Sequence, residues 1–255
     1  MKIMEDWKGT YLMDSHVTTT KAPTSRSAAQ GGDQLTRWLL MGGVVGPALF
    51  VVVLLVEGAT RPGYSAWHQF GSELSLSSQG WEQVANFLMC GLLCLGFAAG
   101  LRRALGRGKG AVAGPMALAV FGAALIAAGI FKTDPGLGYP PGVPALTSPT
   151  PHGAVHALAG LFAFVSLGVA CFALARRFAG DARWRGWAAY SILTGMVVVL
   201  SLVFSNVPSL SDFAGLIQRI GIITGWTWIV LLARGYLLRQ THPSATAAHS
   251  LAGQD

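Results

Sequence analysis

Residues 38–56 read WLLMGGVVGPALFVVVLLV, an apolar run without a charged residue. At a rise of 1.5 Å per residue, a helix of about 20 residues spans the roughly 30 Å hydrocarbon core of a bilayer. Five more runs of similar length follow, at residues 84–101, 111–131, 153–175, 186–205 and 213–232. Because lipid offers no partners for backbone N–H and C=O groups, each run is expected to be an α-helix. The sequence therefore predicts an all-α, polytopic transmembrane helical bundle of six spans over residues 36–239.

The composition of the 255-residue chain agrees with this prediction. Charged residues make up 11% of the chain, whereas a soluble globular protein carries roughly 25%. Hydrophobic residues account for 52%, and the mean hydropathy is +0.50. These values argue against a soluble enzyme. The net charge of +7 would suggest nucleic-acid binding in a soluble protein, but in a membrane protein the positions of the cations carry the information.

Lysine and arginine gather on one side of the predicted membrane. All but three of the 18 cations precede the first span, follow the last, or lie after the second and fourth spans. The exceptions are Arg61, Lys132 and Arg219. Because cytoplasmic loops are enriched in Lys and Arg, both termini are predicted to be cytoplasmic. The polar residues 1–35 and 240–255 are predicted to be disordered cytoplasmic tails.

This charge pattern also predicts the surroundings of the chain. We expect a multi-pass protein of the bacterial plasma membrane whose partners are the bilayer and, at the cytoplasmic loops, anionic headgroups. Nucleic acid is not expected as a partner. Residues 106–110 (GRGKG) lack the spacing and the Ser or Thr of a phosphate loop, so they are interpreted as a basic turn. The spacing of Cys90, Cys94 and Cys171 suits neither a redox nor a zinc-ribbon motif, and these side chains are predicted to be buried.

Two predicted outer connections, residues 57–83 and 132–152, are longer than the topology requires. Long loops in a compact protein are often functional. The second contains a Pro- and Gly-rich stretch at residues 134–142, which is expected to be irregular and to cover the mouth of the bundle. The chemistry of the protein is therefore expected on the extracytoplasmic face.

Two histidines begin the fourth span. His152 and His156 lie four residues apart, so they share one face of a helix. With His68 or Asp134 as a third ligand, this spacing would suit a catalytic zinc ion. Glu73 could then act as the base toward the metal-bound water. Alternatively, the histidines hydrogen-bond carbonyl groups of the loops, and the sequence leaves both interpretations open.

Arg219 lies inside the predicted sixth span, where a cation is costly unless it is paired. Three carboxylates are predicted on the same side of the membrane: Asp212, Asp134 and Glu57. A structural ion pair under the outer loops is therefore predicted, with Asn206 as a further member of this polar network. Binding of a substrate by Arg219 is the alternative.

Several short motifs occur in a defined order along the chain. They are Ser72-Glu73-Leu74, Gly80-Trp81, Asn86-Phe87, Asp134-Pro135, His152-Gly153 with His156, and Gln218-Arg219. In their order and in their positions relative to the spans, they resemble the bacterial six-span membrane protein family catalogued as domain of unknown function 998. The resemblance covers about residues 38–239. It implies a multi-pass plasma-membrane protein and carries over no activity, because the family has no agreed one.

Three functions follow as hypotheses. The first is a multi-pass integral membrane protein of unassigned activity, with a polar pocket on the extracytoplasmic face. The second is a zinc-dependent hydrolase that acts on a lipid or an amide at the outer leaflet. The third is a small-solute transporter, which is disfavoured because the middles of the spans carry no carboxylates.

Overall fold

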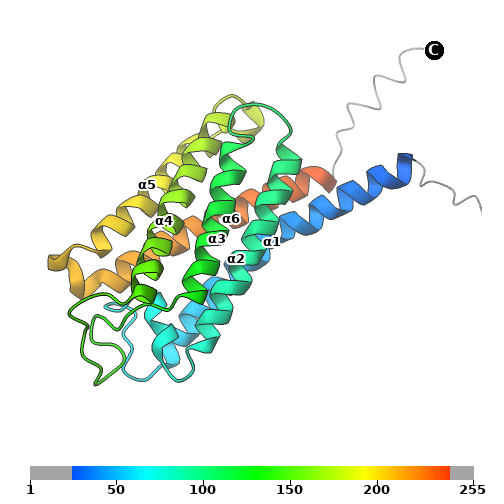
Figure 1. Ribbon diagram of the computed structural model, residues 1–255. Helices are drawn as coiled ribbons and strands as arrows, with labels where there is room; N and C mark the ends of the chain where they lie inside the picture. Colours follow the sequence, from blue (N-terminus) through cyan, green and yellow to red (C-terminus); the bar gives the residue numbers. More distant parts are fainter. Residues whose placement is uncertain (1–24, 242–255) are drawn as a thin grey trace, which may run out of the picture.

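The computed structural model describes residues 25–241, with side chains from residue 33 to residue 239. Its long helices are α1 (Ser25–Thr60), α2 (Trp81–Leu105), α3 (Ala113–Ile130), α4 (Pro151–Phe178), α5 (Trp187–Ser205) and α6 (Ala214–Thr241) (Figure 1). Three short 3-10 helices lie in the connections: η1 (Gly71–Leu76), η2 (Ala182–Trp184) and η3 (Pro208–Phe213). All 6 long helices are long and apolar enough to cross a membrane, which confirms the predicted six-span, all-α fold.

The first helix begins earlier than its apolar run. Residues 25–35 were expected in the N-terminal tail, but α1 begins at Ser25. This polar stretch contains Ala28, Ala29 and Gln30, which favour helix, so the helix continues beyond the apolar run. At the other end, Gln240 and Thr241 were expected in the C-terminal tail but belong to α6. The remaining parts of the predicted tails, residues 1–24 and 242–255, lie outside the described residues.

The long helices form a closed ring. Each packs against its neighbours in chain order, and α6 packs against α1 (Figure 1). At one end of the bundle, the termini end, lie the start of α1, the end of α6 and the short connections 106–112 and 179–186. At the opposite end, the loop end, lie η3 and two longer connections, residues 61–80 and 131–150, which we call the loop cap.

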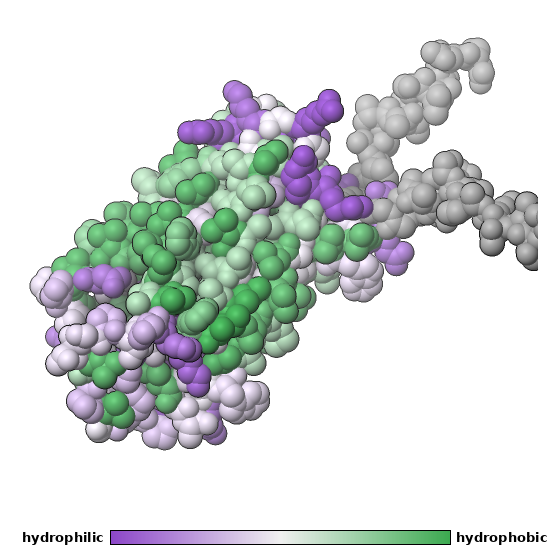
Figure 2. All heavy atoms as spheres, in the orientation of Figure 1, coloured by the Kyte–Doolittle hydropathy of each residue, from purple (hydrophilic) through white to green (hydrophobic). Residues whose placement is uncertain are grey.

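Large apolar side chains point outward around the ring. Leu92, Val52 and Met116 are each more than half exposed, as side chains that face lipid would be. The apolar surface forms a broad band between two polar ends (Figure 2). Trp38 and Trp81 are each 67% exposed. Trp38 lies near the start of the first span and Trp81 at the start of the second, at opposite ends of the bundle. Indole rings prefer such positions at the membrane interface.

Aromatic side chains fill the ring at the termini end. Trp228 is fully buried, and its indole N–H donates to the Ser191 hydroxyl at 2.9 Å. Nearer the termini end, the ring of Trp184 lies 4.7 Å from that of Phe178 and 5.1 Å from that of Tyr236. Such packing leaves little free space in this half of the ring.

Glycine permits a close approach of α1 and α2. A Cβ atom at Gly100 would lie 2.9 Å from the backbone nitrogen of Leu40 and 2.8 Å from the Cβ of Leu39. One turn earlier on the same helix, a Cβ atom at Gly96 would meet only a Leu39 methyl group at 3.7 Å. The two glycines have the small-xxx-small spacing of membrane helix contacts, but only Gly100 lies at the close contact.

Gly100→Ala should lower the free energy of unfolding by about 1–3 kcal/mol, because the added methyl group forces the α1 backbone away. Gly96→Ala should be neutral or stabilising by up to about 1 kcal/mol, because alanine favours helix and meets an ordinary contact. Unfolding in mixed micelles by titration with dodecyl sulfate measures both values. Equal values for the two variants would contradict the close contact at Gly100.

Candidate functional site

The two connections of the loop cap are joined to each other. The side-chain amide of Gln69 donates to the carbonyl of Leu137 at 2.9 Å. The ring of Tyr64 meets that of Tyr139 edge-on, with 5.2 Å between the ring centres. The cap is therefore an ordered layer over the loop end of the bundle.

Arg219 fixes the loop cap to α6. Its Nη1 donates to the carbonyls of Ala66 at 2.9 Å, Gln69 at 3.0 Å and Gly215 at 3.0 Å. Its Nη2 donates to the hydroxyl of Tyr64. Buried backbone carbonyls need donors, and a guanidinium supplies several in one plane. Arg219 thus provides hydrogen-bond donors for carbonyl groups in a turn of the loop cap that belongs to no helix or strand.

The structure does not bring the predicted network of Arg219, Asp212 and Asn206 together. Asp212 lies on η3 with its side chain 88% exposed, and its Oδ1 lies 3.9 Å from Nδ1 of His68. Asn206 ends α5, where its amide donates to the carbonyl of Leu202 at 2.8 Å. Because η3 carries Asp212 outward, carbonyls of the loop cap bind Arg219 instead.

Glu57, the other predicted partner, belongs to a separate cluster. Its Oε1 lies 3.5 Å from Nη2 of Arg61, and the same nitrogen lies 2.5 Å from Oε2 of Glu82. Arg61 also donates to the amide oxygen of Gln79. This cluster ties the end of α1 to the beginning of α2.

Asp134 binds Thr150, the residue that caps the beginning of α4. Its carboxylate accepts from the backbone N–H of Thr150 at 2.8 Å and from the Thr150 hydroxyl at 2.6 Å. That hydroxyl in turn accepts from the backbone N–H of Gly153 at 3.0 Å. The carboxylate lies so close to Gly153 that an added Cβ atom would collide with it. Thr150 is therefore the N-cap residue of α4, because its hydroxyl satisfies a donor of the first turn, and Asp134 holds Thr150 in place.

His156 is buried and faces α3. Its Nδ1 lies 2.8 Å from the carbonyl of Phe131 and 3.1 Å from that of Ala128. Nδ1 must therefore carry the proton, which leaves Nε2 as an acceptor. His152 is exposed on the first turn of α4, with its ring 5.4 Å from that of Phe131.

The predicted zinc ligands thus lie in different settings. His68 faces Asp212, Asp134 binds the cap residue Thr150, and His156 binds carbonyls at the end of α3. Within residues 33–239, no three His, Cys, Asp or Glu side chains form a group that could hold a metal ion. Zinc binding and the hydrolase that depends on it stay predictions.

Glu73, the predicted catalytic base, is buried in η1. Its carboxylate accepts from the backbone N–H of Phe70 at 2.8 Å. Burial raises the pKa of Glu73 to about 7, although hydrogen bonds from the backbone of Phe70 and Gly136 and the charge of Arg219 act in the opposite direction. Glu73 therefore joins both connections of the loop cap and can change its protonation near neutral pH.

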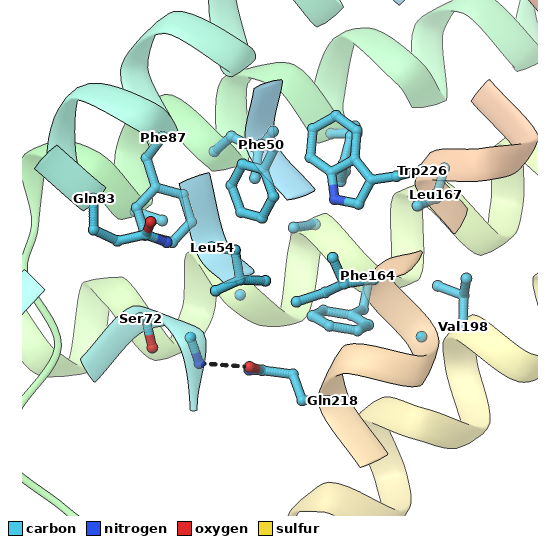
Figure 3. Close-up of a pocket in the computed structure, with 18 of the residues that line it drawn as sticks. Phe50, Leu54, Ser72, Gln83, Phe87, Phe164, Leu167, Val198, Gln218 and Trp226 are labelled. Atoms are coloured by element: carbon cyan, nitrogen blue, oxygen red, sulfur yellow. Dashed lines mark hydrogen bonds between the residues drawn. The ribbon is translucent and has the colours of Figure 1, made fainter. Parts of the chain in front are cut away.

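A cavity of about 80 Å³ lies in the loop half of the ring (Figure 3). Every long helix and η1 contribute to its wall. The apolar part of the wall consists mainly of Phe50, Leu54, Phe87, Phe121, Leu125, Phe164, Leu167, Val198, Ile222 and Trp226. The polar side chains in the wall are Ser72, Gln83, His156 and Gln218, and no Asp, Glu, Lys or Arg lines it.

The amide of Gln83 is fully buried in this wall and has a fixed orientation. The amide nitrogen of Asn86 donates to the carbonyl of Phe50 at 3.3 Å and to Oε1 of Gln83 at 3.2 Å. The amide nitrogen of Gln83 is then left as a donor, and it has no hydrogen-bond partner among the described residues. A buried donor without a partner costs about 1–3 kcal/mol.

The sequence predicted a polar pocket at the outer ends of the spans, but not a cavity between the helices with a mainly apolar wall. Of its polar residues, His156 was singled out for metal binding, and Ser72 and Gln218 only as parts of family motifs. Gln83 and Asn86 carry a signal that could have been used, since they lie three residues apart at the start of an apolar run. Polar residues at that spacing share a face of the helix, and inside a membrane that face must point into the protein.

The ring of apolar helices defines a multi-pass membrane protein. A family model described as "Protein of unknown function (DUF998)" matches residues 44–235, so the chain belongs to this family. The resemblance seen in the sequence is thereby confirmed. No curated protein and no solved structure matches the chain.

The raised pKa of Glu73 makes the stability of the loop cap depend on pH. The folded protein holds the proton more tightly than the unfolded chain, whose carboxyl has a pKa near 4.5. The contribution of Glu73 is therefore most favourable below about pH 4.5 and decreases by up to about 3 kcal/mol as the pH rises to about 7. Protection factors from hydrogen exchange of residues 65–75 should decrease over this range.

Glu73→Gln should remove this pH dependence, because the amide does not titrate. Asp212→Asn serves as the control, since it removes an exposed carboxyl at the same end and should keep the wild-type profile. A wild-type profile in Glu73→Gln would assign the pH dependence to another group.

Proposed function

We propose that this membrane protein binds a small, uncharged amphiphile in the cavity of the loop half. The apolar wall would hold a hydrocarbon chain, and the polar side chains would hold a neutral group such as a hydroxyl or a carbonyl. A charged headgroup is disfavoured, because no charged side chain lines the cavity to compensate it. The pocket with polar groups that the sequence suggested is, in this proposal, mainly an apolar site with a polar edge.

The unpaired donor of Gln83 is the observation that carries this proposal. Membrane proteins rarely bury an amide at the wall of an apolar cavity without a partner for it. The hydrogen bonds of Asn86 leave the nitrogen, rather than the oxygen, of Gln83 available. A ligand with an acceptor oxygen would satisfy this donor, while Nε2 of His156 could accept from a hydroxyl.

The size of the cavity limits the ligand further. About 80 Å³ suits one slender chain or its end rather than a phospholipid with two chains. Gly160 widens the space, because a Cβ atom there would meet no atom within 4 Å. It lies on the face of α4 that also carries the cavity residues His156, Phe164 and Leu167.

Binding can be tested with 1-octanol, octane and octanoate as probes of equal chain length. In lipid nanodiscs, 1-octanol should raise the unfolding temperature of the wild type more than octane or octanoate, because a ligand of the folded state stabilises it. Gly160→Leu should abolish this difference by filling the cavity. Ala157→Leu adds a similar side chain on the exposed face of the same helix and should preserve it.

Gln83→Leu tests the polar edge of the site separately from its apolar wall. It should stabilise the protein without ligand, because an unpaired donor is removed, and it should equalise the effects of 1-octanol and octane. If Gly160→Leu responds to 1-octanol as the wild type does, the cavity is not the binding site.

We also infer that the protein lies in the plasma membrane with its loop end outside the cell. The support is the charge bias: Arg102 and Arg103 end α2 at the termini end, and Arg176 and Arg177 end α4 there. Cations of this kind are retained on the cytoplasmic side.

A green fluorescent protein fused after residue 255 should therefore fluoresce, and alkaline phosphatase fused there should be inactive, because the first folds in the cytoplasm and the second outside it. An insertion of the phosphatase in the connection 131–150 should give the opposite result. Active phosphatase at the C-terminus would reverse the orientation.

A further inference from the structure

A hollow of about 590 Å³ opens at the termini end, between the connections 106–112 and 179–186. Its wall consists of Lys109, Arg176, Arg177, Gly180, Asp181, Ala182 and Arg183. Four cationic side chains thus surround a space that contains one carboxylate. The hollow lies at the opposite end of the bundle from the loop cap and is independent of the cavity beneath it.

Arg177 and Arg183 have partners within the wall of the hollow. Arg177 donates to the carbonyls of Leu105 at 2.8 Å and Arg107 at 3.3 Å, and so holds the connection after α2 against the end of α4. Carbonyl groups are neutral, so the charge of Arg177 remains uncompensated.

Arg183 forms a two-pronged pair with Asp181, with its Nε at 2.9 Å from Oδ1 and its Nη2 at 2.8 Å from Oδ2. The hydrogen bonds from Arg183 lower the pKa of Asp181 to about 2, so the carboxylate stays charged and is neutralised by its own neighbour. It therefore does little to offset the other cations.

The floor beside this pair is rigid. The guanidinium of Arg239 stacks on Trp184, 3.8 Å from the ring centre, and donates to the carbonyl of Arg183 at 3.0 Å. Trp184 is buried against Phe178 and Tyr236. The position of η2 is thus set by the aromatic core of the ring rather than by the exposed connection.

The other two cationic side chains in the wall, those of Lys109 and Arg176, are exposed. Within residues 33–239, the side chains of Arg176 and Lys109 have no hydrogen-bond or ion-pair partner, although the backbone carbonyl of Lys109 accepts from Arg177 at 3.5 Å. With Arg177, they leave three positive charges around the hollow that no carboxylate balances. Three such donors suit a dianion with several oxygens better than a single carboxylate.

We propose that this hollow binds a phosphomonoester, with Lys109 and Arg176 as the side chains that contact its oxygens. The hollow is formed by the last turn of α4 and by the connections 106–112 and 179–186, next to the apolar part of the helices, where lipid headgroups are expected. The phosphate can therefore belong to a lipid such as phosphatidate or to a soluble compound. A phosphomonoester carries close to two negative charges at neutral pH and offers three acceptor oxygens.

The test uses the full chain in phosphatidylcholine nanodiscs doped with either phosphatidate or phosphatidylglycerol, and counts retained lipids by native mass spectrometry. One phosphatidate per chain should be retained in preference to phosphatidylglycerol. Lys109→Gln/Arg176→Gln should weaken this retention by at least about tenfold. Arg185→Gln/Arg234→Gln is the matched control: it removes the same charge from exposed positions at the same end, outside the hollow, and should change retention less than about twofold.

A second arm separates the two sources of phosphate. Glycerol 3-phosphate is titrated by calorimetry into protein in nanodiscs of phosphatidylcholine alone. Heat that the Lys109/Arg176 double variant loses would assign the site to a soluble phosphate, whereas phosphatidate retention without such heat would assign it to a lipid; both support the proposal.

Three outcomes would overturn the proposal. The first is equal loss of phosphatidate in the two double variants, which would mean diffuse attraction to the cationic end. The second is equal retention of phosphatidylglycerol, and the third is no response to any phosphate probe. Because all four substituted side chains are exposed, unfolding temperatures should match the wild type and exclude misfolding as a cause.

Discussion

The contact of α6 with α1 is the constraint on which the rest of the structure depends. It closes the helices into a ring, and a ring of six helices encloses a central space that side chains must fill or leave open. In the termini half, Trp228, Trp184 and Tyr236 fill it. In the loop half, α6 presents Gln218 and Gly221 to the centre, and the cavity remains. The same closure brings Arg219 beneath the loop cap. Helix α6 therefore both completes the ring and binds the loop cap.

The two ends of the bundle differ in how their charged groups are compensated. At the loop end, polar groups are buried and satisfied mostly by neutral partners, as in the bonds of Arg219 to carbonyls and of Asp134 to Thr150. The cavity there remains without charge. At the termini end, cations are exposed in excess over carboxylates, and the hollow near Arg176 keeps that excess. An uncharged ligand in the first site and an anionic one in the second follow from this difference.

The candidate site was only partly predictable from the sequence. His156 was interpreted as a metal ligand, and the alternative of hydrogen bonds to carbonyls is the contact that Nδ1 makes. Asp134 was predicted as a zinc ligand and Arg219 as a member of an ion pair, but their partners are backbone groups and hydroxyls of residues distant in the chain or in irregular loops. Residue types and spacing do not specify such partners, because any exposed carbonyl or N–H can serve. Gln83 was not predicted as a site residue, because it lies just before the apolar run 84–101, where polar residues are common at the membrane interface.

By itself, the sequence determined the six apolar helices, their alternating direction and the side on which the cations gather. Each of these depends on the length, hydropathy or charge of a local segment, because these properties decide how the segment interacts with the bilayer whatever the rest of the fold is. Only the tertiary structure decided which polar side chains meet and where the ring stays open. Those features depend on the packing of helices far apart in the chain, such as α1 with α6, and on how closely residues like Gly100 let them approach. Packing of that kind is fixed by all of its neighbours at once.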